Sequence, residues 1–90
     1  MLIALDYDDT FTKDPDLWID FIKKANLKDH KIICVTMRYS DEGEEVLKSI
    51  GKYCEVIFTS RNAKLQYLSE RNIFPDVWID DNPRWLYVNG

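Results

Sequence analysis

The stretch LIALDYDDT, residues Leu2–Thr10, places a short apolar run directly before a group of acids. An apolar run of this length without alternation is typical of a strand buried on both faces, as in a parallel sheet. Three further runs of the same kind follow along the chain, at Lys31–Thr36, Glu55–Thr59 and Val77–Ile79. The last of these also leads directly into acids. These four runs predict the strands of one sheet.

Helical patterns fill the intervals between these runs. Asp14 and Pro15 are typical of an N-cap and a first helical position, and Leu17, Phe21 and Ala25 then recur every four residues. This spacing predicts a first helix that turns these apolar side chains toward the sheet.

Two more helices are expected. Ser40 predicts the start of the second, Gly51 its left-handed end, and Val46, Leu47 and Ile50 its buried face. The third is expected from about Asn62, as the N-cap, to Arg71. Its inward residues are Leu65 and Leu68.

The resulting β-α-β-α-β-α-β order predicts a three-layer α/β/α, Rossmann-like fold with a mainly parallel sheet and right-handed crossovers. The sheet has four strands, or five if Arg84–Val88 adds a short one. Without a following helix to cover them, the apolar residues Trp85–Val88 are expected to form an edge strand or a contact between subunits of a homo-oligomer.

Composition limits the class of protein. Ninety residues, 46% hydrophobic and 31% charged, predict a single globular domain over residues 1–90. A net charge of −4 argues against a general nucleic-acid surface but is compatible with a phosphate ligand. No apolar run approaches the ~20 residues of a membrane span, so a cytoplasmic protein with no membrane partner is expected. Cys34 and Cys54 are predicted to be reduced core residues.

Acids follow the first and last predicted strands. Since the carboxyl ends of parallel strands meet at one edge of a sheet, five carboxylates should converge there: Asp6, Asp8, Asp9, Asp80 and Asp81. A divalent cation would relieve their repulsion, and an all-oxygen site favours Mg²⁺. Single acids at strand ends are commonly solvated turn formers, and this explanation suffices for Asp9 alone.

Lys64 gives an independent indication. It falls in the first turn of the third predicted helix, where the helix dipole disfavours a cation by about 0.3–1 kcal/mol, and Arg61 lies just before it. Local rules are most often broken at functional sites, although a solvated lysine could also tolerate this penalty.

Four features in this order resemble the motifs of the haloacid dehalogenase superfamily: Asp6-x-Asp8-x-Thr10 after a strand, Thr36 after a strand, Lys64 at a helix start, and Asp80-Asp81 after a strand. The resemblance spans Leu2 to Pro83 and implies a Mg²⁺-dependent phosphohydrolase acting on a phosphorylated substrate, through an aspartyl-phosphate on Asp6.

The resemblance also implies roles for the other residues. Asp8 would be the general acid and base, and its backbone carbonyl a metal ligand. Asp6, Asp80 and Asp81 would complete the metal site, with Asp80 favoured over Asp81 as the direct ligand. Lys64 and Thr36 would bind the phosphoryl oxygens. Thr10 and Arg38 are assigned to substrate binding, Arg38 as a bidentate phosphate clamp or else as a plain surface arginine.

Only about one helix separates successive strands, which leaves no room for the cap domain that many members of this superfamily carry. An open site suits an accessible phosphate, such as a nucleotide, a polynucleotide end or a phosphoprotein, or else a site covered by a neighbouring subunit. Two other classes are weighed. A receiver domain would need an Asp after the third strand, where Thr59 and Ser60 stand instead. A scaffold without useful turnover would serve in binding or regulation.

Overall fold

Four strands form one sheet in the computed structural model, which describes residues 1–90. They are β1 (Leu2–Leu5), β2 (Lys31–Thr36), β3 (Glu55–Phe58) and β4 (Val77–Ile79). The strand order is β3-β2-β1-β4, and every neighbouring pair is parallel. The predicted strands and the parallel, Rossmann-like sheet are thereby confirmed, with four strands in the sheet.

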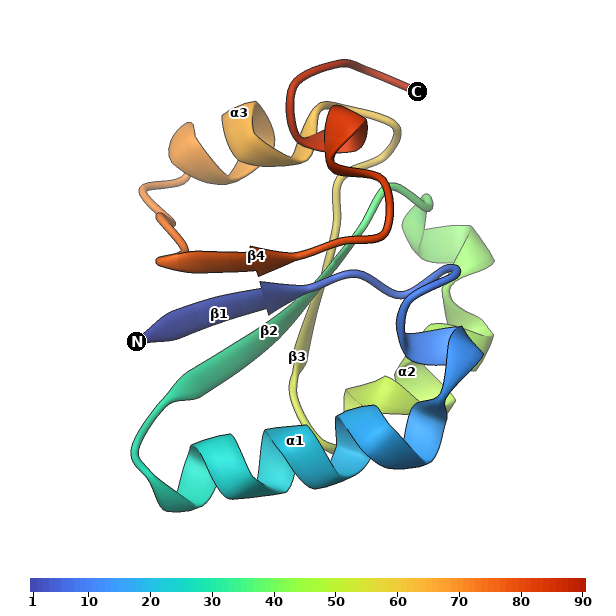
Figure 1. Ribbon diagram of the computed structural model, residues 1–90. Coiled ribbons are helices and arrows are strands. Elements are labelled where there is room, and N and C mark those ends of the chain that lie inside the picture. Colours follow the sequence, from blue (N-terminus) through green and yellow to red (C-terminus); the bar gives the residue numbers. More distant parts are fainter.

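Helices cover both faces of the sheet. They are α1 (Pro15–Leu27), α2 (Glu44–Lys48) and α3 (Lys64–Ser69), joined by the 3₁₀ turns η1 (Phe11–Lys13), η2 (Ser40–Glu42), η3 (Ile50–Lys52) and η4 (Pro83–Leu86). In Figure 1, α1 and α2 lie below the sheet, whereas α3 and the C-terminal turn lie above it. The predicted three layers are therefore present.

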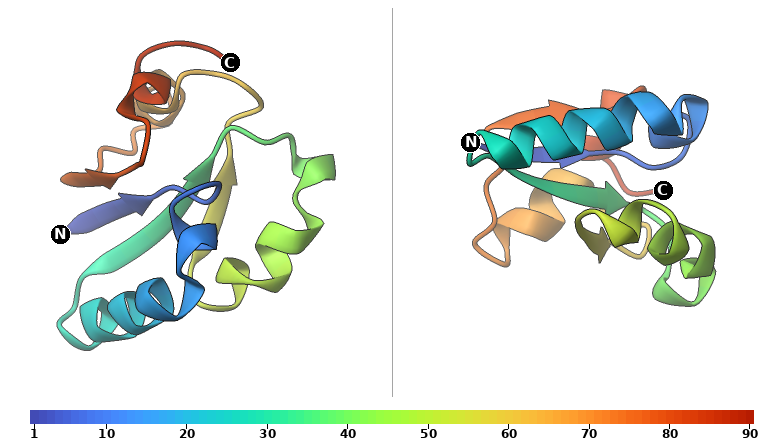
Figure 2. Two further views of the ribbon diagram at one scale, coloured as in Figure 1. Left: turned by 45° about the vertical axis from the view of Figure 1, so that its right-hand side comes forward. Right: turned by 90° about the horizontal axis from the view of Figure 1, so that it is seen from below.

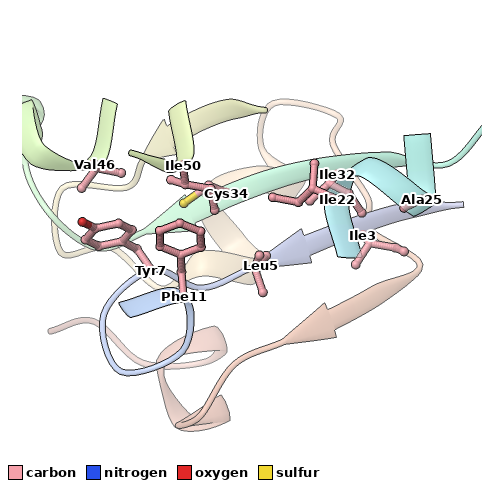
Figure 3. Packing of buried hydrophobic residues seen from close by; sticks show 10 residues of the cluster. All are labelled: Ile3, Leu5, Tyr7, Phe11, Ile22, Ala25, Ile32, Cys34, Val46 and Ile50. Atoms are coloured by element: carbon pink, nitrogen blue, oxygen red, sulfur yellow. The ribbon is translucent and has the colours of Figure 1, made fainter. Parts of the chain in front are cut away.

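The two sides of the sheet carry separate cores. Ile22 and Ala25 of α1 and Val46 of α2 pack against Leu5 and Cys34 in the larger cluster, most of which Figure 3 shows in close-up. The smaller cluster joins α3 to the other face through Ala4, Ile33, Val35 and Leu68. The strands are thus buried on both faces, as their unbroken apolar runs predict.

This arrangement creates a switch point between β1 and β4. The crossovers through α1 and α2 run along one face, and the crossover through α3 then returns along the other face to place β4 beside β1. Ligand sites of open α/β sheets lie beyond the carboxyl ends of the strands at such a switch point. The residues after β1 and β4 therefore occupy the expected place for a site.

Three apolar residues expected to face inward are exposed instead: Leu17, Leu47 and Leu65. On each helix, the face that is buried is narrower than the apolar face that its sequence provides. On α3, Lys64 and Leu68 are one turn apart and both buried, so Leu65 is turned about 100° away from the sheet. The small sheet is too narrow to cover the rest of each stripe.

The second predicted helix is broken into η2, α2 and η3. A Cβ atom on Gly43 would lie 2.3 Å from two ring carbons of Phe58, so a side chain at this position would collide with β3. Gly51 lies inside η3 and does not adopt a positive φ, so the predicted left-handed end there is wrong. The close approach of Gly43 to Phe58 was not visible in the helical pattern.

The third helix is shorter than expected and begins at Lys64, with Ala63 at the N-cap position. Asn62 does not cap it, because its side-chain amide donates to the Thr59 carbonyl oxygen (2.9 Å). The placement of Lys64 in the first turn and the burial of Leu68 are confirmed.

Residues Arg84–Val88 do not form a fifth strand. Pro83 opens the turn η4 at a position where its missing N–H costs nothing. The N–H groups of Tyr87 and Val88 then donate to the Arg84 carbonyl oxygen instead of to a neighbouring strand. Leu86 is buried under this turn, whereas Tyr87 is exposed. The contact between subunits through Trp85–Val88 stays a prediction.

Two further predictions concern the cysteines and possible membrane-spanning helices. Cys34 and Cys54 are both free thiols, the former fully buried, as predicted. None of the helices has the length and apolar character that crossing a bilayer requires.

The start of α1 offers a test of the fold. Asp14 Oδ1 accepts a hydrogen bond from the Leu17 N–H (3.2 Å), as the predicted N-cap should. Asp14→Ala is expected to lower the free energy of unfolding, measured by urea titration, by about 1 kcal/mol. Asp20→Ala, on the exposed middle of the same helix, is the control and should cost nothing, since alanine has the higher helix propensity. Equal losses in the two variants would contradict the capping role of Asp14.

Candidate active site

Three carboxylates meet where β1 and β4 end. Asp6 follows β1 directly, and its N–H donates to the Ile79 carbonyl oxygen (2.9 Å), which extends the pairing of the two strands. Asp80 and Asp81 follow β4. One oxygen from each of these three acids lies within 4.8 Å of the others. The structure thus brings together the acids that the sequence places 74 residues apart, Asp6 and Asp80.

Lys64 lies between two of these acids. Its Nζ donates to Asp6 Oδ1 (2.7 Å) and to Asp80 Oδ2 (2.6 Å), and only 3% of its side chain is exposed. Burial disfavours the ammonium charge, but the two carboxylates outweigh burial, and the pKa of Lys64 is raised. This double ion pair explains why a lysine occupies an unfavourable first-turn position.

Thr10 links Asp6 to Asp81, the one acid of the three that Lys64 does not contact. Its hydroxyl lies 3.0 Å from Asp6 Oδ2 and 3.1 Å from Asp81 Oδ1, and its oxygen accepts from the Asp81 N–H (3.1 Å). A hydroxyl has one proton, so it can donate to only one carboxylate at a time. Asp6 and Asp81 therefore compete for a single donor.

This arrangement changes the acidity of Asp6. Burial raises the pKa of Asp6 to about 7, and the nearby Asp81 and Asp80 act in the same direction, while Lys64 lowers it only in part. Without an added cation, the raised pKa favours the protonated form of Asp6 up to a higher pH than for a free aspartate. One lysine is not enough positive charge for three aspartates.

A pH dependence of stability follows from the raised pKa of Asp6. Since the folded protein holds this proton up to about pH 7 and the unfolded chain releases it near 3.8, folding binds a proton between these values. The free energy of unfolding in EDTA should therefore fall from pH 4 to pH 7, by about 2–4 kcal/mol relative to Asp6→Asn. Urea titrations of the two proteins across this range measure it. If the free energy of unfolding changed with pH in the same way in both proteins, the raised pKa of Asp6 would be contradicted.

Asp8 is held by Arg38 instead of joining the cluster. Arg38 Nε donates to Asp8 Oδ2 (3.0 Å) and Nη2 to Asp8 Oδ1 (2.7 Å), a bidentate pair. The remaining nitrogen, Nη1, donates to the Glu42 carbonyl oxygen (3.0 Å) and to the Glu45 carboxylate. The hydrogen bonds from Arg38 hold the pKa of Asp8 below its usual range, despite partial burial. Every nitrogen of the predicted phosphate clamp is therefore occupied by the protein itself.

The Asp8–Arg38 pair was not anticipated from the sequence. The two residues follow β1 and β2, which are neighbours in the sheet with Leu5 opposite Cys34. Asp8 is three residues past Leu5 and Arg38 four residues past Cys34, so the register places them side by side. Strand order and register, which the sequence pattern did not fix, were the missing information.

A pocket of about 380 Å³ opens above these residues. Six of the predicted site residues line it: Asp6, Asp8, Thr36, Arg38, Lys64 and Asp81. Its other lining residues are Asp9, Met37, Arg61, Asn82, Trp85 and Gly90. Thr10 and Asp80 are not among the lining residues, and only 3% of the Asp80 side chain, which pairs with Lys64, is exposed. The pocket therefore presents Asp6 and Asp81, but not Asp80, to a ligand.

Arg61 and Trp85 also line the pocket, although neither of them was assigned a role in the site from the sequence. Arg61 Nη1 donates to the Met37 carbonyl oxygen (3.0 Å), and its Nη2 lies 3.2 Å from both carboxylate oxygens of Glu42. Only the unusual cation before the third helix pointed to Arg61. No pattern pointed to Trp85, because η4 brings it to the pocket and the turn was not foreseen.

The donor set formed by the three clustered carboxylates suits a hard divalent cation. Three carboxylates and one lysine leave two negative charges uncompensated if all are ionised. Oxygen ligands of this kind are those that Mg²⁺ binds in proteins. Asp6, Asp80 and Asp81 are thus residues that could hold such an ion.

Comparisons of the chain with protein-family models, curated proteins and solved structures give no match. The function is therefore inferred from the residues of this site.

Proposed function

We propose that this chain is a Mg²⁺-dependent phosphomonoesterase of the haloacid dehalogenase type. The observation that carries the proposal is the placement of Asp6, which lies at the switch point of the sheet with Lys64 on one carboxylate oxygen and Thr10 on the other. Asp80 and Asp81 lie beside it, and the pocket opens above it. A carboxylate so placed is suited to act as a nucleophile.

Asp6 would carry out the first step. One of its carboxylate oxygens attacks phosphorus, the bond between phosphorus and the ester oxygen breaks, and an aspartyl-phosphate forms. The ester oxygen leaves as an alcohol or phenol after it takes up a proton. In the second step water attacks the same phosphorus, loses a proton, and releases phosphate and the original Asp6 carboxylate. The sum is one ester and one water converted into one alcohol and one phosphate.

Asp8 would accept the proton from water in the second step. The Arg38 pair keeps this carboxylate ionised, which suits a base. Giving a proton to the leaving oxygen in the first step is harder, since Asp8 must first acquire one against the influence of Arg38. Substrates whose leaving group needs little protonation should therefore react best.

Lys64 and Thr36 would stabilise charge on the phosphoryl oxygens. Lys64 brings a buried positive charge next to the Asp6 carboxylate, 2.7 Å from Oδ1. Thr36 accepts a long hydrogen bond from the Arg38 N–H (3.4 Å), so its own hydroxyl proton is available to a ligand in the pocket. Charge-directed donors in a partly buried site are the main source of rate enhancement in phosphoryl transfer.

Asp6 and Asp81 would hold the cation together with the backbone carbonyl of Asp8, because both side chains face the pocket. Asp80, predicted from the resemblance as the direct ligand, does not line the pocket and pairs with Lys64, so it would act by fixing that lysine. A bound Mg²⁺ would neutralise the excess carboxylate charge and draw electrons from a phosphoryl oxygen.

The bidentate Asp8–Arg38 pair also favours a second candidate. If Arg38 does not release Asp8, the site would bind a phosphate group with little turnover, as a binding or regulatory module. A receiver domain has no support, since Thr59 at the end of β3 is fully buried and donates its hydroxyl to the Asn62 carbonyl oxygen (2.8 Å).

Hydrolysis of a generic aryl phosphate tests the proposal. The purified protein should release the phenol with Mg²⁺, lose this activity in EDTA, and regain it on adding Mg²⁺ in excess. Turnover unaffected by EDTA would reject the metal-dependent mechanism. Phosphate binding measured by calorimetry, without hydrolysis of any ester in a panel, would favour the binding module.

Leaving-group dependence tests the roles of Asp8 and Arg38. An aryl phosphate is expected to react at least about tenfold faster than an alkyl phosphate, because general acid catalysis is worth about 10²–10⁴-fold and Asp8 supplies it poorly. Arg38→Met should raise the pKa of Asp8 and narrow this difference. An equal fall in kcat/KM for both esters would instead identify Arg38 as a phosphate clamp.

A further inference from the structure

The segment formed by residues 87–90 lies beside the loop between β3 and α3, as the left view of Figure 2 shows. Asn89 Oδ1 accepts a hydrogen bond from the Ala63 N–H (2.7 Å). The Gly90 N–H donates to the Arg61 carbonyl oxygen (2.8 Å). Two consecutive residues of the segment thus bind the last part of the loop that leads into Lys64.

This loop needs support from outside. Ser60 and Arg61 both have left-handed backbones, with φ of 53° and 67°, a conformation uncommon for residues with a side chain. Ala63 occupies the N-cap position of α3 and has no side-chain oxygen with which to cap the helix. In a capping box, the side chain of the third helical residue accepts from the N-cap N–H. In α3 that position is held by Gln66, and Asn89 accepts this hydrogen bond in its place.

Lys64 follows Ala63 directly, so the position of its backbone depends on this bond. Its Nζ must reach Asp6 Oδ1 and Asp80 Oδ2 at the same time, at 2.7 and 2.6 Å. Thr59 and Asn62 bind each other through three hydrogen bonds, which fix the beginning of the loop but leave the Ala63 N–H without a partner there. Asn89 supplies that partner.

We propose that Asn89 is a positioning residue, which holds Lys64 against Asp6 by capping the start of α3. The predicted effect of Asn89 on catalysis rests on the proposed function. Its predicted effect on the position of Lys64 does not depend on that function, and the two effects can be measured separately.

NMR spectroscopy tests the position of Lys64. In Asn89→Ala, the amide of Ala63 should exchange with solvent about 5- to 20-fold faster, the factor by which loss of a cap shifts an opening equilibrium. The Lys64 side-chain ammonium and Cε signals should move toward those of the exposed lysines. Asn89→Asp keeps the accepting oxygen, so its Ala63 exchange rate and its Lys64 signals should both stay close to those of the wild type. Protected amides in β1 and β2 establish that each variant is folded.

Kinetics test the consequence for catalysis. Asn89→Ala is expected to lower kcat for an aryl phosphate about 5- to 20-fold with little change in KM, because Lys64 acts on the charge that develops during reaction. Asn89→Asp should lie within about twofold of the wild type. Tyr87→Ala, in the same segment but largely exposed, is the matched control and should leave kcat unchanged.

The outcomes separate this inference from the proposed function. Unchanged Lys64 signals in Asn89→Ala would overturn it, whatever the kinetics. If the Lys64 signals shift in Asn89→Ala but the wild-type protein hydrolyses no ester, the positioning role is supported while the proposed function fails. If Asn89→Ala does not fold, Asn89→Gln displaces the same oxygen by one methylene, and the same two measurements decide.

Discussion

Asp6→Asn is expected to lower kcat for an aryl phosphate by about 10⁴-fold or more, the scale seen when a covalent nucleophile is removed. Asparagine matches aspartate in shape; its one side-chain oxygen can still accept from Lys64, and its amide nitrogen can donate to the Thr10 oxygen, so the pocket should persist. What is lost is the carboxylate that attacks phosphorus. Initial rates in excess Mg²⁺ measure the effect, and urea titration in EDTA should show a variant at least as stable as the wild type, because one of three clustered negative charges is gone.

Asp9→Asn is the matched control for this prediction. Asp9 lies three residues further along the same loop, lines the same pocket and is exposed. Its backbone is left-handed (φ 62°), a conformation that asparagine adopts as readily as aspartate. Its kcat should stay within about threefold of the wild type, as is usual for a solvated turn residue. Comparable activity in Asp6→Asn and Asp9→Asn would reject Asp6 as the nucleophile.

Lys64→Met is expected to lower the free energy of unfolding in EDTA by about 3–5 kcal/mol, because removing one partner of a buried ion pair leaves its charge uncompensated. Methionine fills much of the same volume, so the loss reflects charge more than packing. For a domain of 90 residues this is a large part of a total on the order of 5–13 kcal/mol. Urea titration at neutral pH measures it.

Two comparisons identify the cause of this loss. Lys48→Met removes an exposed lysine that pairs with Glu44 one turn away, and should cost no more than about 0.5 kcal/mol. Adding Mg²⁺ to Lys64→Met should restore part of the stability, since the three aspartates would then face a cation again. A variant as stable as the wild type without a cation would mean that the aspartates do not repel one another in this site.

The strands and their order along the chain could be predicted because buried parallel strands leave unbroken apolar runs, as in residues 2–5 and 31–36. The inward faces of the helices could be predicted only in part. Ala25 and Val46 are buried as their stripes suggest, but Leu17 and Leu47 are not. How wide a stripe the sheet covers depends on its size and on the angle of each helix, and neither is encoded in the helical period.

The candidate site also has a part that could be predicted from the sequence and a part that could not. Asp6, Asp80 and Asp81 could be brought together in advance because strand ends converge at one edge of a parallel sheet. The Asp8–Arg38 pair and the Asn89 cap could not, because the first depends on strand register and the second on a turn at the other end of the chain. Contacts between loops follow from the completed fold, so they are absent from the local patterns that predict strands and helices.

The edge position of β4 has a consequence for the growing chain. This strand supplies three residues to the sheet, pairs only with β1, and is followed by two of the clustered acids. Synthesis proceeds from the N-terminus, so β1, β2 and β3 are made before β4. Asp6 therefore has neither Asp80 nor Asp81 as a neighbour until β4 has been synthesised and has docked beside β1. The cluster of three carboxylates is thus among the last features of this domain that translation can complete.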